Sequence, residues 1–137
     1  MNPSLWNLLH DATLAAVEGS VPGDLLLTIE CDYIREMLPR TGAGFVVRLC
    51  GCSFFEFEPY DQPPYADLPA IGQLELEILS AEAGNPLAIC CTGGTLRLRY
   101  ESAEIALDSG KAISLGELDR AAARYWRQWE QRNQPAP

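Results

Sequence analysis

Short apolar segments punctuated by glycine and proline recur along residues 13–108 of this chain. Each has the length of a β-strand. In several of them apolar and polar residues alternate, which is typical of a strand with one face in the core and one in solvent. Tight turns join antiparallel strands, whereas parallel strands need long crossovers. The spacing therefore predicts a mainly antiparallel sheet of about seven or eight strands, curved or folded into two layers.

The first two segments predict a β-hairpin. Residues 13–18 and 24–31 flank the run Gly-Ser-Val-Pro-Gly, whose Pro-Gly pair is a turn signal. Because successive side chains of a strand point to opposite faces, Leu25, Leu27 and Ile29 share one face. We expect that face to enter the core.

The later segments extend the predicted sheet. Gly51 predicts a bend between two of them. One run, Pro86–Cys91, is almost wholly apolar, which predicts a strand covered on both faces. The other strands are expected at residues 45–50, 54–58, 74–78, 96–100 and 104–108.

The segments of residues 74–78 and 96–100 carry opposite charges on their outer faces. If they lie close together, Glu75 and Glu77 face Arg97 and Arg99, and such cross-strand pairs help to set the register. The alternative is that all four side chains are simply solvated.

Helices are expected at the two ends of the chain. Residues 3–9 predict a short helix with Pro3 in its first position and Asn2 as its cap. Ser114 and Glu117 match the capping box S-x-x-E, from which a helix should run to about Arg132.

The long helix has an apolar stripe that includes Leu118, Tyr125 and Trp129, which we expect to pack on the sheet. The chain is therefore predicted to be an α+β protein with a single domain over residues 1–137. Residues 133–137 are expected to form a disordered tail.

Charge and cysteine content narrow the class of protein. Nineteen acidic and ten basic residues leave a net charge of -9, which argues against a general affinity for nucleic acid or anionic membranes. The surface would suit a basic partner instead. No apolar run reaches the roughly 20 residues that span a bilayer. Without a secretory signal pattern, the five cysteines favour a reducing cytoplasm over a disulfide framework.

The cysteines are expected to be small apolar residues of the strands. A metal or redox site formed by Cys50, Cys52 and one of Cys90 and Cys91 is the alternative, and their spacing is unlike that of structural zinc sites. No nucleotide or metal motif is present, so no cofactor and no metal are predicted.

His10 and Asp11 are the only weak candidates for catalysis. Sequence neighbours do not normally form a working dyad, so we expect the pair to end the first helix. The alternative is an enzyme in which His10 works with a cysteine or a carboxylate.

Two surfaces are candidates for binding a partner. The proline-rich loop of residues 59–69 presents tyrosines and carboxylates at low entropic cost, namely Tyr60, Asp61, Tyr65 and Asp67. Packing of the tyrosines onto the domain itself is the alternative. The last helix carries a basic face for an acidic partner, with a solvated face as the alternative, formed by Arg120, Arg124, Arg127 and Arg132.

The run Leu9-His10-Asp11-Ala12-Thr13-Leu14 resembles an L-H-D-A-x-L stretch that precedes the first hairpin of small bacterial β-rich domains. Some members of that group are similar to immunity proteins of toxin systems. The resemblance covers only residues 9–14 and implies a β-rich fold, with no catalytic residues to transfer.

These features leave three hypotheses for the function of the chain. The leading hypothesis is a non-enzymatic protein-binding module, of immunity type, that masks a partner surface. The second is a β domain that binds a small molecule inside its curved sheet. The third is the enzyme based on His10. The amino-acid sequence predicts no particular oligomeric state.

Overall fold

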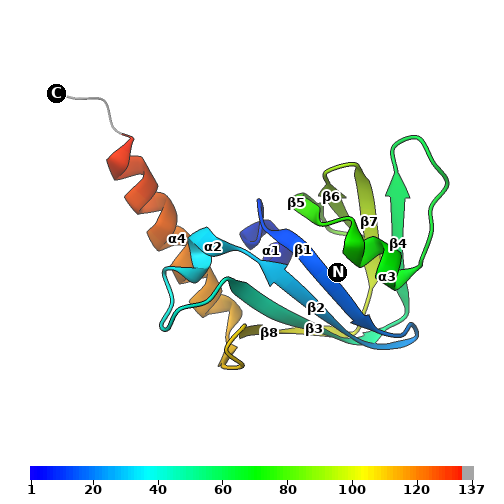
Figure 1. The fold of residues 1–137 in the computed structure, drawn as a ribbon, viewed down its shortest axis with the longest axis horizontal. Helices are drawn as coiled ribbons and strands as arrows, with labels where there is room; N and C mark the ends of the chain where they lie inside the picture. The colour runs from blue at the N-terminus through cyan, green and yellow to red at the C-terminus, as the bar shows by residue number, and fades with distance from the viewer. Residues whose placement is uncertain (134–137) are drawn as a thin grey trace.

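The computed structural model describes residues 1–133 and has an α+β fold with an open, curved, antiparallel sheet (Figure 1). The tail expected at residues 133–137 falls outside the described residues except for Asn133, which caps the last helix. In chain order the elements are α1 (Ser4–Leu8), β1 (Thr13–Gly19), β2 (Gly23–Glu30), α2 (Asp32–Arg35), β3 (Gly44–Cys52), β4 (Phe54–Pro59), α3 (Leu68–Gln73), β5 (Leu76–Glu82), β6 (Leu87–Cys91), β7 (Gly94–Arg99), β8 (Ser102–Leu107), β9 (Ala112–Ile113) and α4 (Leu115–Arg132).

The nine strands follow the order β4-β7-β6-β5-β1-β2-β3-β8-β9. β3 runs on into β4, and β7 runs on into β8, so one long antiparallel ribbon belongs to both halves of the sheet. Ser53 N donates to Arg99 O at 2.8 Å and Glu101 N donates to Cys50 O at 2.9 Å where the ribbon bends. The β4–β7 end and the β3–β8 end of the sheet are therefore joined by continuous chain, which explains the strong curvature of the sheet in Figure 1.

The bend occurs where the sequence predicts it. Gly51 has a φ of 61°, a value that glycine adopts at little cost. Its N–H donates to Asp24 Oδ1 at 2.9 Å, and Asp24 also pairs with Arg48 at 2.9 Å. The β2–β3 edge of the ribbon is thereby fixed by a carboxylate from the first hairpin.

The core confirms the predicted hairpin. β1 and β2 pair in antiparallel fashion, and Leu25, Leu27 and Ile29 are buried. They join one continuous cluster of buried side chains from both halves of the sheet and from the helices. The buried faces of the strands therefore meet in a single core.

The strand expected at residues 74–78 lies two residues further along the chain. β5 begins at Leu76, because Glu75 has a φ of 51° and breaks the extended backbone. Leu74 consequently lies outside the sheet and is exposed. The alternation of apolar and acidic residues was a sound signal for Leu76 and Ile78 only.

The proposed charge pairing between residues 74–78 and 96–100 is wrong. β6 lies between β5 and β7, so Glu75 and Glu77 cannot face Arg97 and Arg99. Arg97 instead lies opposite Glu56 of β4, and its guanidinium is 3.6 Å from Glu58. A short-range charge pattern cannot identify the neighbouring strand, because strand order is set by the whole sheet.

The strand at Pro86–Cys91 is also not covered on both faces. In β6, Leu87, Ile89 and Cys91 are buried, whereas Ala88 is half-buried and Cys90 is exposed. Cys90 and Cys91 do point to opposite faces, as predicted. The outer face of β6 simply carries small apolar side chains.

Two short helices were not predicted. α2 follows β2 directly, and α3 lies where only a loop was expected, with Pro69 in its first turn. Proline is tolerated there because the first helical N–H groups lack partners in any case. α3 covers β1, where a Cβ on Gly72 would lie 3.2 Å from Val17 N.

The end helices follow the sequence closely. α1 begins at Ser4, one residue later than expected, so its N-cap is Pro3 and not Asn2, and no side-chain cap bond forms. Asn2 Oδ1 instead accepts a hydrogen bond from Ser4 N at 2.8 Å. Ser114 caps α4 by accepting a hydrogen bond from Glu117 N at 3.1 Å. Within residues 1–133, no helix is long and apolar enough to cross a membrane.

The principal neighbours of α4 are α1 and α2. Leu118, Ala121 and Ala122 are buried in the shared core, whereas the second half of the helix extends past the sheet (Figure 1). The apolar stripe of this helix was expected to pack on the sheet, but it packs mainly on α1 and α2, and Trp129 at its far end is 44% exposed.

Candidate functional site

His10 lies in an aromatic cluster at the α4 end of the molecule. Its ring stacks on Trp126 with centroids 5.4 Å apart, and Tyr33 lies 6.3 Å away. Tyr125 lies 4.7 Å from Tyr33, and Trp129 adds an edge contact to Trp126 at 5.9 Å. The cluster joins α2, α4 and the segment between α1 and β1.

The hydrogen bonds of His10 describe a structural role. Nδ1 lies 3.0 Å from Asn7 O, and because a carbonyl only accepts, Nδ1 carries the hydrogen. Nε2 lies 4.0 Å from Asp11 Oδ2, which is too far for a hydrogen bond. The Tyr33 hydroxyl donates to the His10 carbonyl. The expectation that His10 and Asp11 terminate α1 agrees with this geometry, since Asp11 has a left-handed φ of 67°.

Among residues 1–133, the polar contacts given for the His10 ring are those with Asn7 O and with the Asp11 carboxylate. His10 makes no hydrogen bond to a thiol and lines none of the described cavities. Desolvation by burial raises the pKa of Cys31 to about 11 and that of Cys91 to about 12, so both thiols stay protonated at neutral pH.

The cysteines are only partly the buried strand residues that were predicted. Cys31, Cys52 and Cys91 are buried, whereas Cys50 is half-buried and Cys90 is exposed. Among residues 1–133, no three His, Cys, Asp or Glu side chains gather in a way that could hold a metal ion.

The proline-rich loop holds Tyr60 out in solvent. The Tyr60 side chain is 70% exposed, the largest value among the exposed large apolar side chains of the described chain. Its N–H donates to Gly93 O at 3.1 Å, and its hydroxyl lies 3.5 Å from Cys91 O. Tyr60 is therefore anchored over the β6–β7 turn while its ring face stays free.

The other loop candidates have internal roles. Tyr65 packs edge-to-face on Phe57 with centroids 6.1 Å apart, and the two residues exchange backbone hydrogen bonds of 3.0 Å. Asp67 caps α3 by accepting from Ala70 N at 3.1 Å. The alternative of self-packing is thus the correct one for Tyr65, whereas Asp61 stays exposed beside Tyr60.

A shallow hollow of about 380 Å³ lies beside Tyr60. Leu74, 45% exposed, forms part of it together with Tyr65 and the β6–β7 turn. We call the exposed residues here the Tyr60 surface, which comprises Tyr60, Asp61, Gln62, Leu74 and Thr92. Sequence reasoning missed Leu74, because the alternating pattern assigned it to the core face of a strand.

The basic face of α4 lies opposite its apolar stripe. Arg120, Arg124 and Arg127 are exposed, and the ion pairs of residues 1–133 include none of them. Arg120 and Arg124 border a small hollow of about 200 Å³ against Met37 and Leu38. The exposed arginines agree with a solvated helix face as well as with a face that binds an acidic partner.

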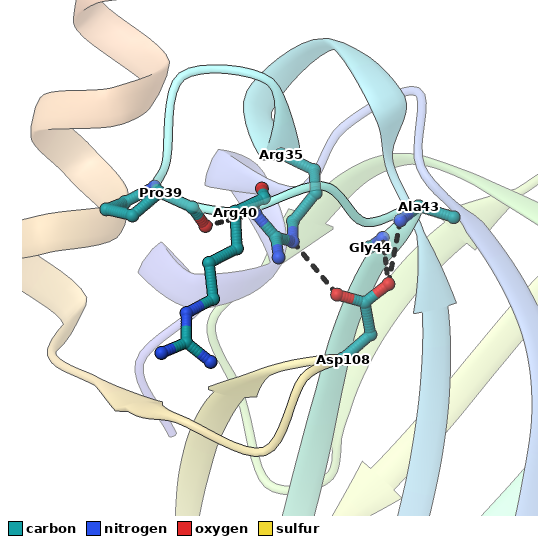
Figure 2. Close-up of polar contacts among 6 residues, drawn as sticks. All are labelled: Arg35, Pro39, Arg40, Ala43, Gly44 and Asp108. Atoms are coloured by element: carbon teal, nitrogen blue, oxygen red, sulfur yellow. Dashed lines mark hydrogen bonds and ion pairs between the residues drawn. The ribbon is translucent and has the colours of Figure 1, made fainter.

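A charge cluster around the buried Arg35 side chain supports the loop between α2 and β3 (Figure 2). The Arg35 side chain is fully buried, and its Nε donates to Asp108 Oδ1 at 2.9 Å. Its Nη1 donates to Pro39 O at 3.1 Å and to Arg40 O at 3.0 Å, while Nη2 is buried without a partner among the described residues. Arg35 therefore holds the loop from inside.

Asp108 completes this cluster from the end of β8. Its Oδ2 accepts from Ala43 N at 2.7 Å and from Gly44 N at 3.2 Å. Desolvation by burial acts to raise the pKa of Asp108, but the hydrogen bonds from Ala43, Arg35 and Gly44 outweigh it and hold the pKa below its usual range. Nothing in the sequence around Arg35 signals the cluster, because its counter-ion, Asp108, lies 73 residues away along the chain.

The residues that resemble the L-H-D-A-x-L stretch form the connection between α1 and β1. Leu9, Ala12 and Leu14 are buried, and Asp11 N donates to Ile78 O at 2.6 Å. Together with Ile78 N, which donates to Ala12 O at 2.8 Å, this bond joins the two halves of the sheet beside the short β1–β5 pairing. The residues of this stretch therefore serve the fold, through buried side chains and backbone hydrogen bonds to β5.

Comparison with protein-family models, with curated proteins and with solved structures finds no match for this chain. Its function is therefore inferred from its own geometry.

Proposed function

We propose that this protein is a non-enzymatic binding module that covers part of a partner protein with the Tyr60 surface. The observation that carries the proposal is the Tyr60 side chain, 70% exposed on a loop that backbone bonds hold in place. Tyrosine is a favoured anchor at interfaces, and a loop that is already ordered loses little entropy on binding.

The composition of the Tyr60 surface supports a protein partner. Tyr60 and Leu74 provide an apolar centre, and Asp61 with the neighbouring exposed Glu75 provides an acidic rim. An apolar centre within a polar rim is the usual anatomy of such interfaces. The net charge of -9 favours a basic partner.

An immunity protein that neutralises a toxin by covering its surface is the form of this proposal that the resemblance of residues 9–14 favours. Such a protein needs an exposed contact surface, and Tyr60 and Leu74 are exposed side chains that could form one.

Comparative affinity capture tests the proposal. The wild-type protein and the double variant Tyr60→Ser/Leu74→Ser would be used as baits in an extract of the cells that make it, and bound proteins quantified by mass spectrometry. Leu26→Ser is the matched control, because Leu26 is also 45% exposed but lies on the outer face of β2. Circular dichroism would check that each bait is folded.

We expect a basic protein to be enriched by the wild type and by Leu26→Ser and to be lost with the double variant. Enrichment of no protein by the wild type, or equal enrichment by all three baits, would overturn the proposal. A captured toxin would establish the immunity form of it.

A further inference from the structure

A groove lies at the open edge of the sheet, outside its interior. It measures about 760 Å³ and is bounded by the beginning of α1, by β8 and by the start of α4. Figure 1 shows β8 and the start of α4 at the lower left and the loop after β4 at the upper right, so this groove is remote from the Tyr60 surface. It is therefore a separate candidate site.

The edge of β8 is only partly covered. β9 has two residues, and it pairs with Ile105 and Ala106 alone. Ser102, Ala103 and Glu104 pair with β3 on their inner side and have no strand on their outer side within residues 1–133. An edge of this kind offers backbone groups to another chain.

The hydrogen-bond alternation identifies the free backbone groups. Leu107 N donates outward to Lys111 O at 2.8 Å, and Ile105 lies opposite Ile113 of β9. Along an antiparallel strand every second residue bonds to the same side. The N–H and C=O of Ala103 therefore also point outward, where β9 has already ended at Ile113.

The walls of the groove are apolar and firmly held. Leu115 at the start of α4 is 43% exposed, and Leu5, Ile105 and Ile113 contribute further apolar surface. Trp6 Nε1 donates to the Tyr100 hydroxyl at 3.0 Å, which fixes the Tyr100 ring as one wall. An apolar side chain entering beside Ala103 would lose water contact without any rearrangement of these groups.

The rim of the groove is acidic. Glu101 and Glu104 both border it, both are exposed, and neither takes part in an ion pair among residues 1–133. Arg48, which lies opposite Glu104 on β3, is already paired with Asp24 at 2.9 Å. These two carboxylates are available to a cation on the incoming molecule.

We propose that the free edge of β8 binds an extended segment of another protein in which a basic residue immediately precedes an apolar one. Added as an antiparallel strand, the apolar residue lies opposite Ala103 and exchanges two backbone hydrogen bonds with it. Its side chain shares the face of Ile105 and enters the groove. The residue before it lies opposite Glu104, on the outer face, where a positive charge is matched.

The register distinguishes this occupant from a small apolar molecule. A small molecule would fill the groove without using the Ala103 backbone, and it would not require a cation at the Glu104 position. Both features are needed by the peptide. The inference does not depend on the Tyr60 surface, because the two sites share no residue.

Synthetic peptides test it directly. The probe is acetyl-Ser-Thr-Lys-Ile-Thr-Ser-amide, and the controls replace its Lys with Glu or methylate its Ile nitrogen. Binding would be followed by the amide shifts of ¹⁵N-labelled protein in NMR titrations. We expect the Ala103 and Ile105 amides to shift with the Lys-Ile peptide, and each control peptide to bind at least about tenfold more weakly.

Two protein variants complete the test. Ala103→Pro removes the outward N–H at an edge position where proline is tolerated, and Glu104→Lys reverses the rim charge without touching the backbone. Both should weaken the Lys-Ile peptide by about tenfold or more. Tyr60→Ser should leave its affinity unchanged.

Equal binding of the N-methylated peptide would overturn strand addition, because the groove would then take apolar side chains alone. Equal binding of the Glu-Ile peptide, or shifts confined to residues away from β8, would overturn it as well. Loss of partner capture by Tyr60→Ser/Leu74→Ser with peptide binding intact would leave both proposals standing, so the two can fail separately.

Discussion

Both ends of the molecule carry aromatic side chains, but they use them in different ways. At the α4 end, Trp126 contacts the rings of His10, Tyr33 and Tyr125, so these aromatic side chains pack on one another. At the loop end, Tyr60 is held mainly by its backbone, and its ring is left to solvent. The first arrangement contributes to folding, whereas the second leaves the Tyr60 ring exposed as the centre of the proposed contact surface.

The two ends also differ in how their loops are held. The loop between α2 and β3 surrounds a buried guanidinium and is closed by the Asp108 carboxylate. The loop after β4 is held by the exchange of backbone hydrogen bonds between Phe57 and Tyr65 and by the cap at Asp67. Stability should therefore be sensitive to substitution at the first loop and tolerant at the second.

Removing the carboxylate of Asp108 should have the largest effect. In Asp108→Ala the buried Arg35 loses its counter-ion and the amides of Ala43 and Gly44 lose their acceptor. Leaving the charge of the buried Arg35 without its carboxylate costs about 3 kcal/mol of the free energy of unfolding. Urea unfolding would measure it. Asp61→Ala, an exposed loop carboxylate, is the control and should stay within about 0.5 kcal/mol of wild type.

A methyl group inside the first loop should have the next largest effect. In Gly42→Ala the Cβ would contact Asp108 Oδ1 and would lie 2.6 Å from Arg35 Nε, so the cluster must open. Overpacking of this kind costs about 2 kcal/mol. Gly116→Ala is the matched control: its nearest contact is 3.5 Å and it lies in α4, where alanine is favoured. Equal thermal midpoints for the two variants would contradict the prediction.

The comparison of the two aromatic regions can be tested by removing one ring from each and comparing the losses of stability. Trp126→Ala should lower the free energy of unfolding by about 1.5 kcal/mol, because several ring contacts are lost together. Tyr60→Ala should change it by less than about 0.5 kcal/mol. Denaturant titrations of both variants test this. A larger loss for Tyr60→Ala would mean that its ring contributes to folding.

The pH dependence should be the smallest effect. Because the pKa of Asp108 is lower in the folded chain than in the unfolded chain, its stabilisation is fully present above the usual carboxyl range. It is lost as the pH falls through the folded-state pKa. The difference in the free energy of unfolding between wild type and Asp108→Asn should therefore become smaller as the pH is lowered from about 7 to about 3. A difference that stays constant over this range would contradict the assignment.

Local patterns identified most of the elements. The hairpin of residues 13–31, the bend at Gly51 and the capped helix from Ser114 depend on neighbouring residues, and the structure has all three. The patterns failed at Glu75, where a left-handed residue shifts the strand start. They also failed at α2, which is too short for a helical period to emerge.

The candidate sites were only partly predictable for the same reason. Tyr60 and Asp61 were identified, because a proline-rich loop and its tyrosines are visible in the sequence. Leu74 was not, since its exposure depends on where β5 begins. The groove at β8 was missed altogether, because it exists only where β9 ends and α1 approaches.

The sequence by itself determined the class of this protein: an acidic α+β chain of short antiparallel strands with a capped helix at its end. Periodicity and turn chemistry act over a few residues, so they are legible without the fold. Strand order, the bent ribbon from β3 to β8, the burial of Arg35 and the open β8 edge were decided by tertiary structure alone. Each depends on which distant segments become neighbours, and that is settled by the packing of the whole core.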